Sequence, residues 1–153
     1  MTSTPLVSVI MPVYNGEKYL KKAIASVAVQ ELPLELITID DCSQDNSAAI
    51  IASCRDDYPN MEFVHITNEK NMGVAKSRNA GVRVARAPYI AFLDCDDWWE
   101  PGKLSAQLSR MEKSCRVLSC TAREFVEDNG APTGRIVPVS EIITYGQLLK
   151  FNS

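Results

Sequence analysis

Hydrophobic and polar positions along the chain follow two periods, one typical of buried strands and the other of amphipathic helices. Runs rich in apolar and β-branched residues predict strands over 6–13, 34–41, 61–67 and 89–94. Between these runs apolar residues recur at helical spacing, which predicts helices over 17–30, 46–57, 72–86 and 101–113. Alternating strands and helices predict an α/β fold with a mostly parallel sheet and helices on both faces.

The C-terminal part of the chain has a weaker pattern. Residues 116–126 alternate as a further strand, residues 127–134 are rich in turn formers, and Thr144 is placed to cap a last short helix. The length of 153 residues fits one compact domain over 1–153. The chain stops at "LLKFNS" without a closing element, so we expect it to be the first part of a larger protein.

Composition narrows the class of protein. Hydrophobic residues make up 46% of the chain and charged residues 23%, which is ordinary for a globular domain with a real core. The net charge is −3 without a basic block, which argues against a nucleic-acid polymer as partner. An anionic ligand would therefore have to be bound by groups close to it, such as backbone N–H groups, a few basic side chains or a metal.

The number of cysteines and the length of the apolar runs indicate in which cellular compartment the protein works. Five cysteines without any C-x-x-C pair argue against a disulfide framework or a zinc site and predict reduced thiols in the cytoplasm. The N-terminus lacks the basic region of a signal peptide, and no run approaches the ~20 apolar residues of a membrane span. Peripheral contact with the inner face of the membrane stays open.

Polar side chains follow three of the predicted strands at the point where each strand ends. Tyr14 and Asn15 follow the first strand, Asp41 the second, and Asp94 and Asp96 the fourth. Parallel sheets of this class bind ligands outside the carboxyl ends of their strands. We therefore expect these side chains to converge on one edge of the sheet.

The acidic turn after the fourth strand is a candidate metal site. Asp94 and Asp96 are separated only by Cys95, and oxygen ligands of this kind suit Mg²⁺ or Mn²⁺. Like charges ~4 Å apart repel by about 4 kcal/mol at an effective dielectric near 20, so a diphosphate needs a divalent ion to approach them. The alternative is a solvated acidic turn before a helix. Trp98 and Trp99 either anchor this turn or line a sugar pocket.

The other polar positions each have a structural alternative. The Asp41 carboxylate can accept a hydrogen bond from the imide N–H of uracil or from a ribose hydroxyl, but it can equally form an Asx turn or cap a helix. Tyr14 can stack on a base, and Asn15 and Gly16 permit a left-handed turn. Arg78 can donate hydrogen bonds to a base carbonyl or a phosphate. The alternative is that it forms an ion pair at the surface. The chain has no glycine-rich dinucleotide loop and no P-loop lysine, which disfavours NAD and ATP P-loop chemistry.

Four segments follow one another over roughly residues 6–110, namely "VSVIMPVYNGEKYLKKAIASV", "ITIDDCSQDNS", "NMGVAKSRNAG" and "YIAFLDCDDWWEPGKL". Together, and in this order, they resemble family 2 glycosyltransferases of the GT-A fold. The resemblance implies a Rossmann-like GT-A fold. It also implies metal-dependent, inverting transfer of a sugar from a nucleotide diphosphate, with a UDP-sugar as the expected donor. The acceptor would be a saccharide or lipid-linked saccharide of cell-surface polysaccharide synthesis.

The resemblance also implies residue roles. The nucleotide-sugar site would comprise the loop against the base, the acid that holds uracil, the basic contact to the nucleotide and the D-x-D element, namely Pro12, Val13, Tyr14, Asn15, Asp41, Arg78, Asp94, Cys95 and Asp96. Asp94 and Asp96 would hold the Mg²⁺ or Mn²⁺ ion. Cys95 takes the tolerant middle position of D-x-D, where we expect its identity to matter little.

Two departures from the family matter. Cys42 stands where the family commonly has glycine, and we expect its thiol to narrow the donor pocket. The family's catalytic base lies well beyond the D-x-D element, and no physical ground selects one among Glu124, Glu127, Asp128 and Glu141. The catalytic residue stays unknown, and a non-catalytic nucleotide-sugar-binding module of the same fold is the alternative. Flavodoxin-like regulators and metal-dependent phosphatases usually place their key acids after the first strand, where this chain has Tyr14 and Asn15, so both are disfavoured. A nucleotidyltransferase is disfavoured because the glycine-rich loop that it needs after the first strand is missing.

Overall fold

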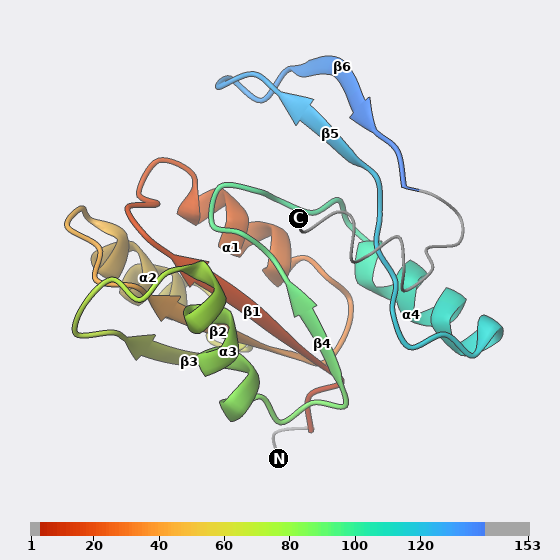
Figure 1. The fold of residues 1–153 in the computed structure, drawn as a ribbon, viewed down its shortest axis with the longest axis horizontal. Helices are drawn as coiled ribbons and strands as arrows, with labels where there is room; N and C mark the ends of the chain where they lie inside the picture. The colour runs from red at the N-terminus through yellow and green to blue at the C-terminus, as the bar shows by residue number, and fades with distance from the viewer. Residues whose placement is uncertain (1–3, 140–153) are drawn as a thin grey trace. The chain divides into compact units, whose positions relative to one another are not determined.

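The computed structural model describes residues 4–139 of the chain. Contacts divide the chain into two compact units, Met1–Ala106 and Gln107–Ser153. Figure 1 labels the helices and strands along the chain. The helix expected at Thr144 lies outside the described residues. The single domain expected over 1–153 stays a prediction, because a unit defined by contacts need not fold by itself.

Strands and helices alternate through the first unit, as the sequence predicts. The elements are β1 (Val7–Val13), α1 (Leu20–Ala28), β2 (Leu34–Asp40), α2 (Ser47–Asp57), β3 (Glu62–Thr67), α3 (Val74–Val84), β4 (Tyr89–Phe92) and α4 (Lys103–Ser114), the last of which crosses the boundary between the units. All lie within the predicted ranges except α4, which ends one residue later.

The sheet is parallel throughout, in the order β3-β2-β1-β4. Right-handed crossovers place α1 and α2 on one face and α3 on the other. In agreement with this, α1 contacts α2, whereas α3 packs on β1 and β2. All residues of the central strand β1 are buried, because helices cover it on both faces. The predicted α/β fold is therefore confirmed.

Helix α3 lies unusually close to the sheet because of Gly81. A Cβ atom at Gly81 would lie 2.6 Å from Cγ2 of Ile10 and 2.9 Å from Cδ1 of Ile39, both of which are fully buried. Only a residue without a side chain permits this approach. Glycine here therefore sets the depth at which α3 packs.

A buried carboxylate on β2 ties the start of the sheet to the segment after α3. Glu35 is fully buried, and its Oε1 accepts hydrogen bonds from Ser8 Oγ (2.6 Å) and from the Arg86 N–H (2.8 Å). Its Oε2 accepts from Arg86 Nε (3.0 Å) and Nη2 (2.7 Å). Burial alone would raise the pKa of Glu35, but the hydrogen bonds from Ser8 and Arg86 outweigh it and lower the pKa.

The described part of the second unit contains a small antiparallel hairpin of β5 (Arg123–Val126) and β6 (Pro132–Val137). The strand predicted over 116–126 is therefore wrong for residues 116–122, which pair with no strand in the described part of the chain, and Val117 is 96% exposed. The turn predicted over 127–134 is shorter than expected because β6 begins inside it. No helix among residues 4–139 is long and apolar enough to cross a membrane.

Replacing Gly81 by alanine should destabilise the protein. Overpacking of a rigid core costs about 1–3 kcal/mol, whereas alanine gains only about 1 kcal/mol in helix propensity over glycine. We expect a net loss of about 1 kcal/mol in the free energy of unfolding, measured by urea denaturation. Ala75→Gly, at an exposed position of the same helix, isolates the propensity effect. A Gly81→Ala protein more stable than the parent would contradict the close approach.

Glu35→Gln should cost about 2 kcal/mol of unfolding free energy at pH 7, because its amide N–H₂ would face buried donors and an unsatisfied buried donor costs about 1–3 kcal/mol. Arg86 is itself 51% exposed and keeps its ion pair with Glu62. The folded-state pKa of Glu35 lies below its ordinary value of 4.5. The stability it contributes is therefore present above about pH 4.5 and is lost as the pH falls through the folded-state pKa. Urea denaturation over a pH series should show the two proteins converging at low pH. Glu31→Gln, at an exposed acid, is the control, and a constant difference between parent and Glu35→Gln would refute the linkage.

Candidate functional site

A pocket of about 240 Å³ opens at the carboxyl edge of the sheet. The ends of β1, β2 and β4 and the start of α3 line it through Pro12, Val13, Tyr14, Asp41, Asn71, Gly73, Val74, Ser77, Asp94 and Cys95. The strand order reverses between β1 and β4, so this pocket lies at the topological switch point where sheets of this class bind ligands.

Two loops at this edge are held together by hydrogen bonds. The N–H of Asn15 donates to Ser43 Oγ (3.0 Å), the N–H of Gly16 donates to Ser47 Oγ (2.9 Å), and the N–H of Gln44 donates to Asn15 Oδ1 (2.8 Å). Asn15 has the expected left-handed backbone, with φ of 51°. Its amide oxygen holds the neighbouring loop, while the ring of Tyr14 remains 51% exposed at the pocket.

Asp41 is buried and holds the loop that precedes α3. Its Oδ1 accepts hydrogen bonds from the Met72 N–H (2.8 Å) and Asn68 Nδ2 (2.7 Å), and its Oδ2 accepts from the Gly73 N–H (2.7 Å). No side-chain hydrogen bond caps α3, and Asp41, just past the end of β2, instead fixes the backbone of the two residues that precede the helix. With Ser77 as a fourth donor, the roughly four acceptor positions of the carboxylate are occupied by groups of the protein itself.

These contacts also determine the charge of Asp41. Burial alone would raise its pKa, but the hydrogen bonds from Met72, Asn68 and Gly73, together with Ser77, outweigh burial and lower the pKa. Asp41 is therefore ionised at neutral pH, and its negative charge lies beside the pocket.

Arg78 and Asp94 form an ion pair. Arg78 Nη2 lies 2.5 Å from Asp94 Oδ1, and the two side chains are 36% and 44% exposed. The guanidinium also lies 5.7 Å from the centre of the Phe92 ring. Its Nε is buried and has no hydrogen-bond partner among the described residues. An unsatisfied buried donor costs about 1–3 kcal/mol, so Arg78 would gain from a ligand that offers it more acceptors.

The D-x-D acids fit a divalent metal by ligand type. Carboxylate oxygens suit Mg²⁺ and Mn²⁺, which usually bind one or two carboxylates together with water and substrate phosphates. Asp96 is exposed, whereas Asp94 is engaged by Arg78. Within residues 4–139 no three His, Cys, Asp or Glu side chains gather into a metal site. A cation here would therefore need ligands from a bound nucleotide.

The cysteines of the two acidic segments differ from expectation. Cys42 has a φ of 67°, a left-handed conformation that favours glycine, and it is not among the residues lining the pocket. Cys95 does line the pocket, and a Cβ at Gly16 would lie only 2.9 Å from its Sγ. The middle residue of D-x-D thus packs against the turn after β1, and burial raises the pKa of its thiol.

The tandem tryptophans anchor the acidic turn. Lys22 Nζ lies 3.2 Å from the centre of the Trp98 ring, and Lys103 Nζ lies 3.9 Å from that of Trp99. The N–H of Trp99 donates to Ser26 Oγ on α1. Burial lowers the pKa of Lys103 to about 8. Neither tryptophan lines the pocket, which supports the anchoring alternative over a sugar contact.

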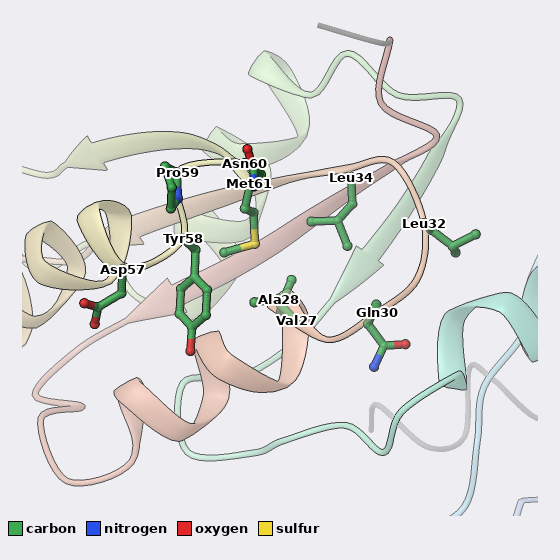
Figure 2. Close-up of a pocket in the computed structure, with 10 residues that line it drawn as sticks. All are labelled: Val27, Ala28, Gln30, Leu32, Leu34, Asp57, Tyr58, Pro59, Asn60 and Met61. Atoms are coloured by element: carbon green, nitrogen blue, oxygen red, sulfur yellow. The ribbon is translucent and has the colours of Figure 1, made fainter.

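A second pocket, of about 310 Å³, lies at the opposite edge of the sheet. Figure 2 shows its lining, which comes from the end of α1, the loop leading to β2 and the segment between α2 and β3. None of the predicted site residues lines it, and Asp57 is its only charged lining residue. The chemistry expected from the sequence is therefore concentrated at the carboxyl edge.

The structure brings most of the predicted residues together and adds others. Pro12, Val13, Tyr14, Asp41, Asp94 and Cys95 line the carboxyl-edge pocket, whereas Asn15, Arg78 and Asp96 do not. Sequence reasoning missed Asn68 and Ser77 as partners of Asp41, although Asn68 directly follows β3 and so obeys the same strand-end rule. Among the acids considered as the base, Glu141 lies outside the described residues, and the others lie in the second unit.

Comparison with known proteins assigns the chain to a family. The model of the family "Glycosyl transferase family 2" matches residues 8–151. The protein TuaG of Bacillus subtilis (strain 168), named as a teichuronic acid biosynthesis glycosyltransferase, is 37% identical over 148 residues, which are 95% of this chain and 58% of TuaG. The UDP-Glc:alpha-D-GlcNAc-diphosphoundecaprenol beta-1,3-glucosyltransferase WfgD of Escherichia coli is 36% identical over 95% of this chain and 55% of WfgD. The chain thus spans little more than half of these relatives.

Solved structures agree with this assignment. S. aureus TarS 1-349 in complex with UDP-GlcNAc has a TM-score of 0.65 and 26% identity, covering 78% of this chain and 40% of the chain in that structure. The mannosyltransferase PcManGT from Pyrobaculum calidifontis, in complex with GDP-Man and Mn²⁺, has a TM-score of 0.67. It is 22% identical over 72% of this chain and 33% of that enzyme. At this level of identity the similarity concerns the fold alone. These neighbours confirm the predicted GT-A fold.

Asp41→Asn should destabilise the loop before α3. The amide would place an N–H₂ group against backbone donors, and an unsatisfied buried donor costs about 1–3 kcal/mol. We expect a loss of about 2 kcal/mol in the free energy of unfolding by urea denaturation, with faster amide exchange at Met72 and Gly73. Asp56→Asn, at an exposed acid of α2, should leave both unchanged. Unaltered exchange in Asp41→Asn would show that the carboxylate does not hold this loop.

Proposed function

This chain belongs to glycosyl transferase family 2, and from that premise we propose that it forms the donor-binding part of a glycosyltransferase that uses a nucleotide diphosphate sugar. One observation carries the proposal: the loop after β1, Asp41 and the D-x-D acid Asp94 line a single pocket at the switch point of the sheet. Segments far apart in the chain thus supply a stacking ring, an acceptor for a base N–H and one carboxylate for a cation.

A uridine diphosphate donor fits these groups best. Tyr14 is an exposed residue whose ring would stack on a base, and the ionised Asp41 at the pocket would accept the imide N–H of uracil in place of one of its present donors. The UDP-glucose donor in the name of WfgD and the UDP-GlcNAc complex of TarS support the same choice. The names of TuaG and WfgD also support a saccharide or lipid-linked acceptor in cell-surface polysaccharide synthesis.

The proposed reaction is an inverting transfer, in which an acceptor hydroxyl attacks the anomeric carbon from the face opposite the nucleotide. Arg78 would stabilise the charge on the departing diphosphate, while Asp94 and Asp96 would hold Mg²⁺ or Mn²⁺. When bound, the divalent ion supplies Lewis-acid stabilisation of the leaving group. We place the base that deprotonates the acceptor in the acceptor-binding half of the whole protein.

We further propose that the protein works in the cytoplasm, in peripheral contact with the inner face of the membrane. The support is the lipid-linked acceptor in the name of WfgD. A non-catalytic binding module of the same fold is the alternative. In the whole protein, Asp96→Ala separates the two, because only an enzyme has metal-dependent turnover to lose.

Calorimetric titration of the chain with UDP, GDP and dTDP, each with and without Mn²⁺, tests the proposed donor. We expect UDP to bind most tightly and Mn²⁺ to improve its affinity at least about tenfold, which is about 1.4 kcal/mol. Asp96→Ala should abolish the Mn²⁺ effect, whereas Glu69→Gln, at an exposed acid, should keep it. Equal affinity for the three nucleotides would overturn the uridine assignment, and no binding of any of them would overturn the proposed function.

A further inference from the structure

The Arg78–Asp94 ion pair joins the two groups that a nucleotide and a cation would each require. We propose that Arg78 withholds Asp94 from a divalent cation until a diphosphate arrives, so that cation and nucleotide bind cooperatively through this pair. The inference rests on the proposed nucleotide-sugar function and concerns the order in which its ligands enter.

The first step is the closeness of the pair. With Arg78 Nη2 2.5 Å from Asp94 Oδ1, a cation bound at Asp94 would lie beside the positive guanidinium. Like charges at this range repel, and the pair would have to separate before Asp94 could bind the ion well. Asp96, which is exposed and lies in the same turn, is then the only D-x-D acid available to a cation that arrives alone.

The second step is the incomplete satisfaction of Arg78. Its Nε is buried without a partner among residues 4–139, although a guanidinium is built to donate two parallel hydrogen bonds. Phosphate oxygens accept such a bidentate pair with favourable geometry. A diphosphate in the pocket would therefore draw the guanidinium away from Asp94 and offer it acceptors for both donors.

The third step is that the exchange needs only side-chain motion. Asp41 holds the loop before α3 through the N–H groups of Met72 and Gly73, and Glu35 holds the segment after it through Arg86. With the helix held at both ends, Arg78 turns on a fixed backbone. Once it turns to the phosphates, Asp94 would be released and could hold the cation together with Asp96. Coupling between two ligands is reciprocal, so each ligand raises the affinity for the other.

Mn²⁺ binding to the 153-residue chain tests this, with free Mn²⁺ followed by electron paramagnetic resonance in the absence and presence of UDP. In the parent we expect weak Mn²⁺ binding alone and about tenfold tighter binding with UDP, within the usual 5–150-fold range of such couplings. Arg78→Met releases Asp94, so Mn²⁺ alone should bind about threefold or more tightly than to the parent, and the coupling to UDP should shrink. A residue that served only to bind the nucleotide would not produce this gain.

Two controls separate the pair from its surroundings. Arg83→Met removes the same charge from an exposed position on α3 and should leave Mn²⁺ affinity unchanged. Arg78→Lys keeps the charge beside Asp94 and should keep Mn²⁺ binding weak in the absence of UDP. It also serves as the test if Arg78→Met fails to fold, because tight Mn²⁺ binding to Arg78→Lys alone would contradict the proposal.

The outcomes distinguish this inference from the proposed function. If UDP binds with Mn²⁺ but Arg78→Met gains no affinity for Mn²⁺ alone, the exchange is refuted while nucleotide binding stands. If the parent binds none of the nucleotides with Mn²⁺, the proposed function fails and the exchange fails with it. If Arg83→Met gains as much affinity as Arg78→Met, the effect is one of overall charge and the ion pair has no special part.

Discussion

Helix α3 is held at both ends by two buried carboxylates that belong to one neighbouring segment of chain. Glu35, near the start of β2, accepts the N–H of Arg86 after the helix, and Asp41, just past the end of β2, accepts the N–H groups of Met72 and Gly73 before it. Between these ends Gly81 lets the helix lie directly against the sheet. Because α3 carries Arg78 to the carboxyl edge, the position of that cation depends on these contacts.

The rest of the carboxyl edge is equally constrained by polar contacts within the protein. Hydrogen bonds join the turn after β1 to the loop after β2, and the acidic turn after β4 is fastened to α1 through Trp99 and Ser26. Most polar groups here thus have a partner before any ligand arrives, which favours binding without large rearrangement. The Arg78–Asp94 pair differs, since one of its donors lacks a partner and both groups suit a ligand better.

The departures from the family pattern acquire a physical meaning at this edge. Cys42 occupies a left-handed backbone position, where glycine avoids steric strain, and its thiol does not reach the pocket lining. Cys95 fills the space against Gly16 and joins the D-x-D turn to the turn after β1. Cys42 thus bears on the backbone conformation of its loop, whereas Cys95 contributes to packing at the pocket.

The sequence by itself determined the order of strands and helices in the first unit, the parallel sheet and the edge at which Tyr14, Asp41 and Asp94 would meet. Hydrophobic periodicity encodes which positions are buried, and strand direction follows from alternation with helices. Only the tertiary structure decided that Asp41 holds the loop before α3, that Arg78 pairs with Asp94, and that residues 116–122 form no strand. Such partners depend on which donor and acceptor atoms come within about 3 Å of each other after folding, and spacing along the chain does not encode that distance.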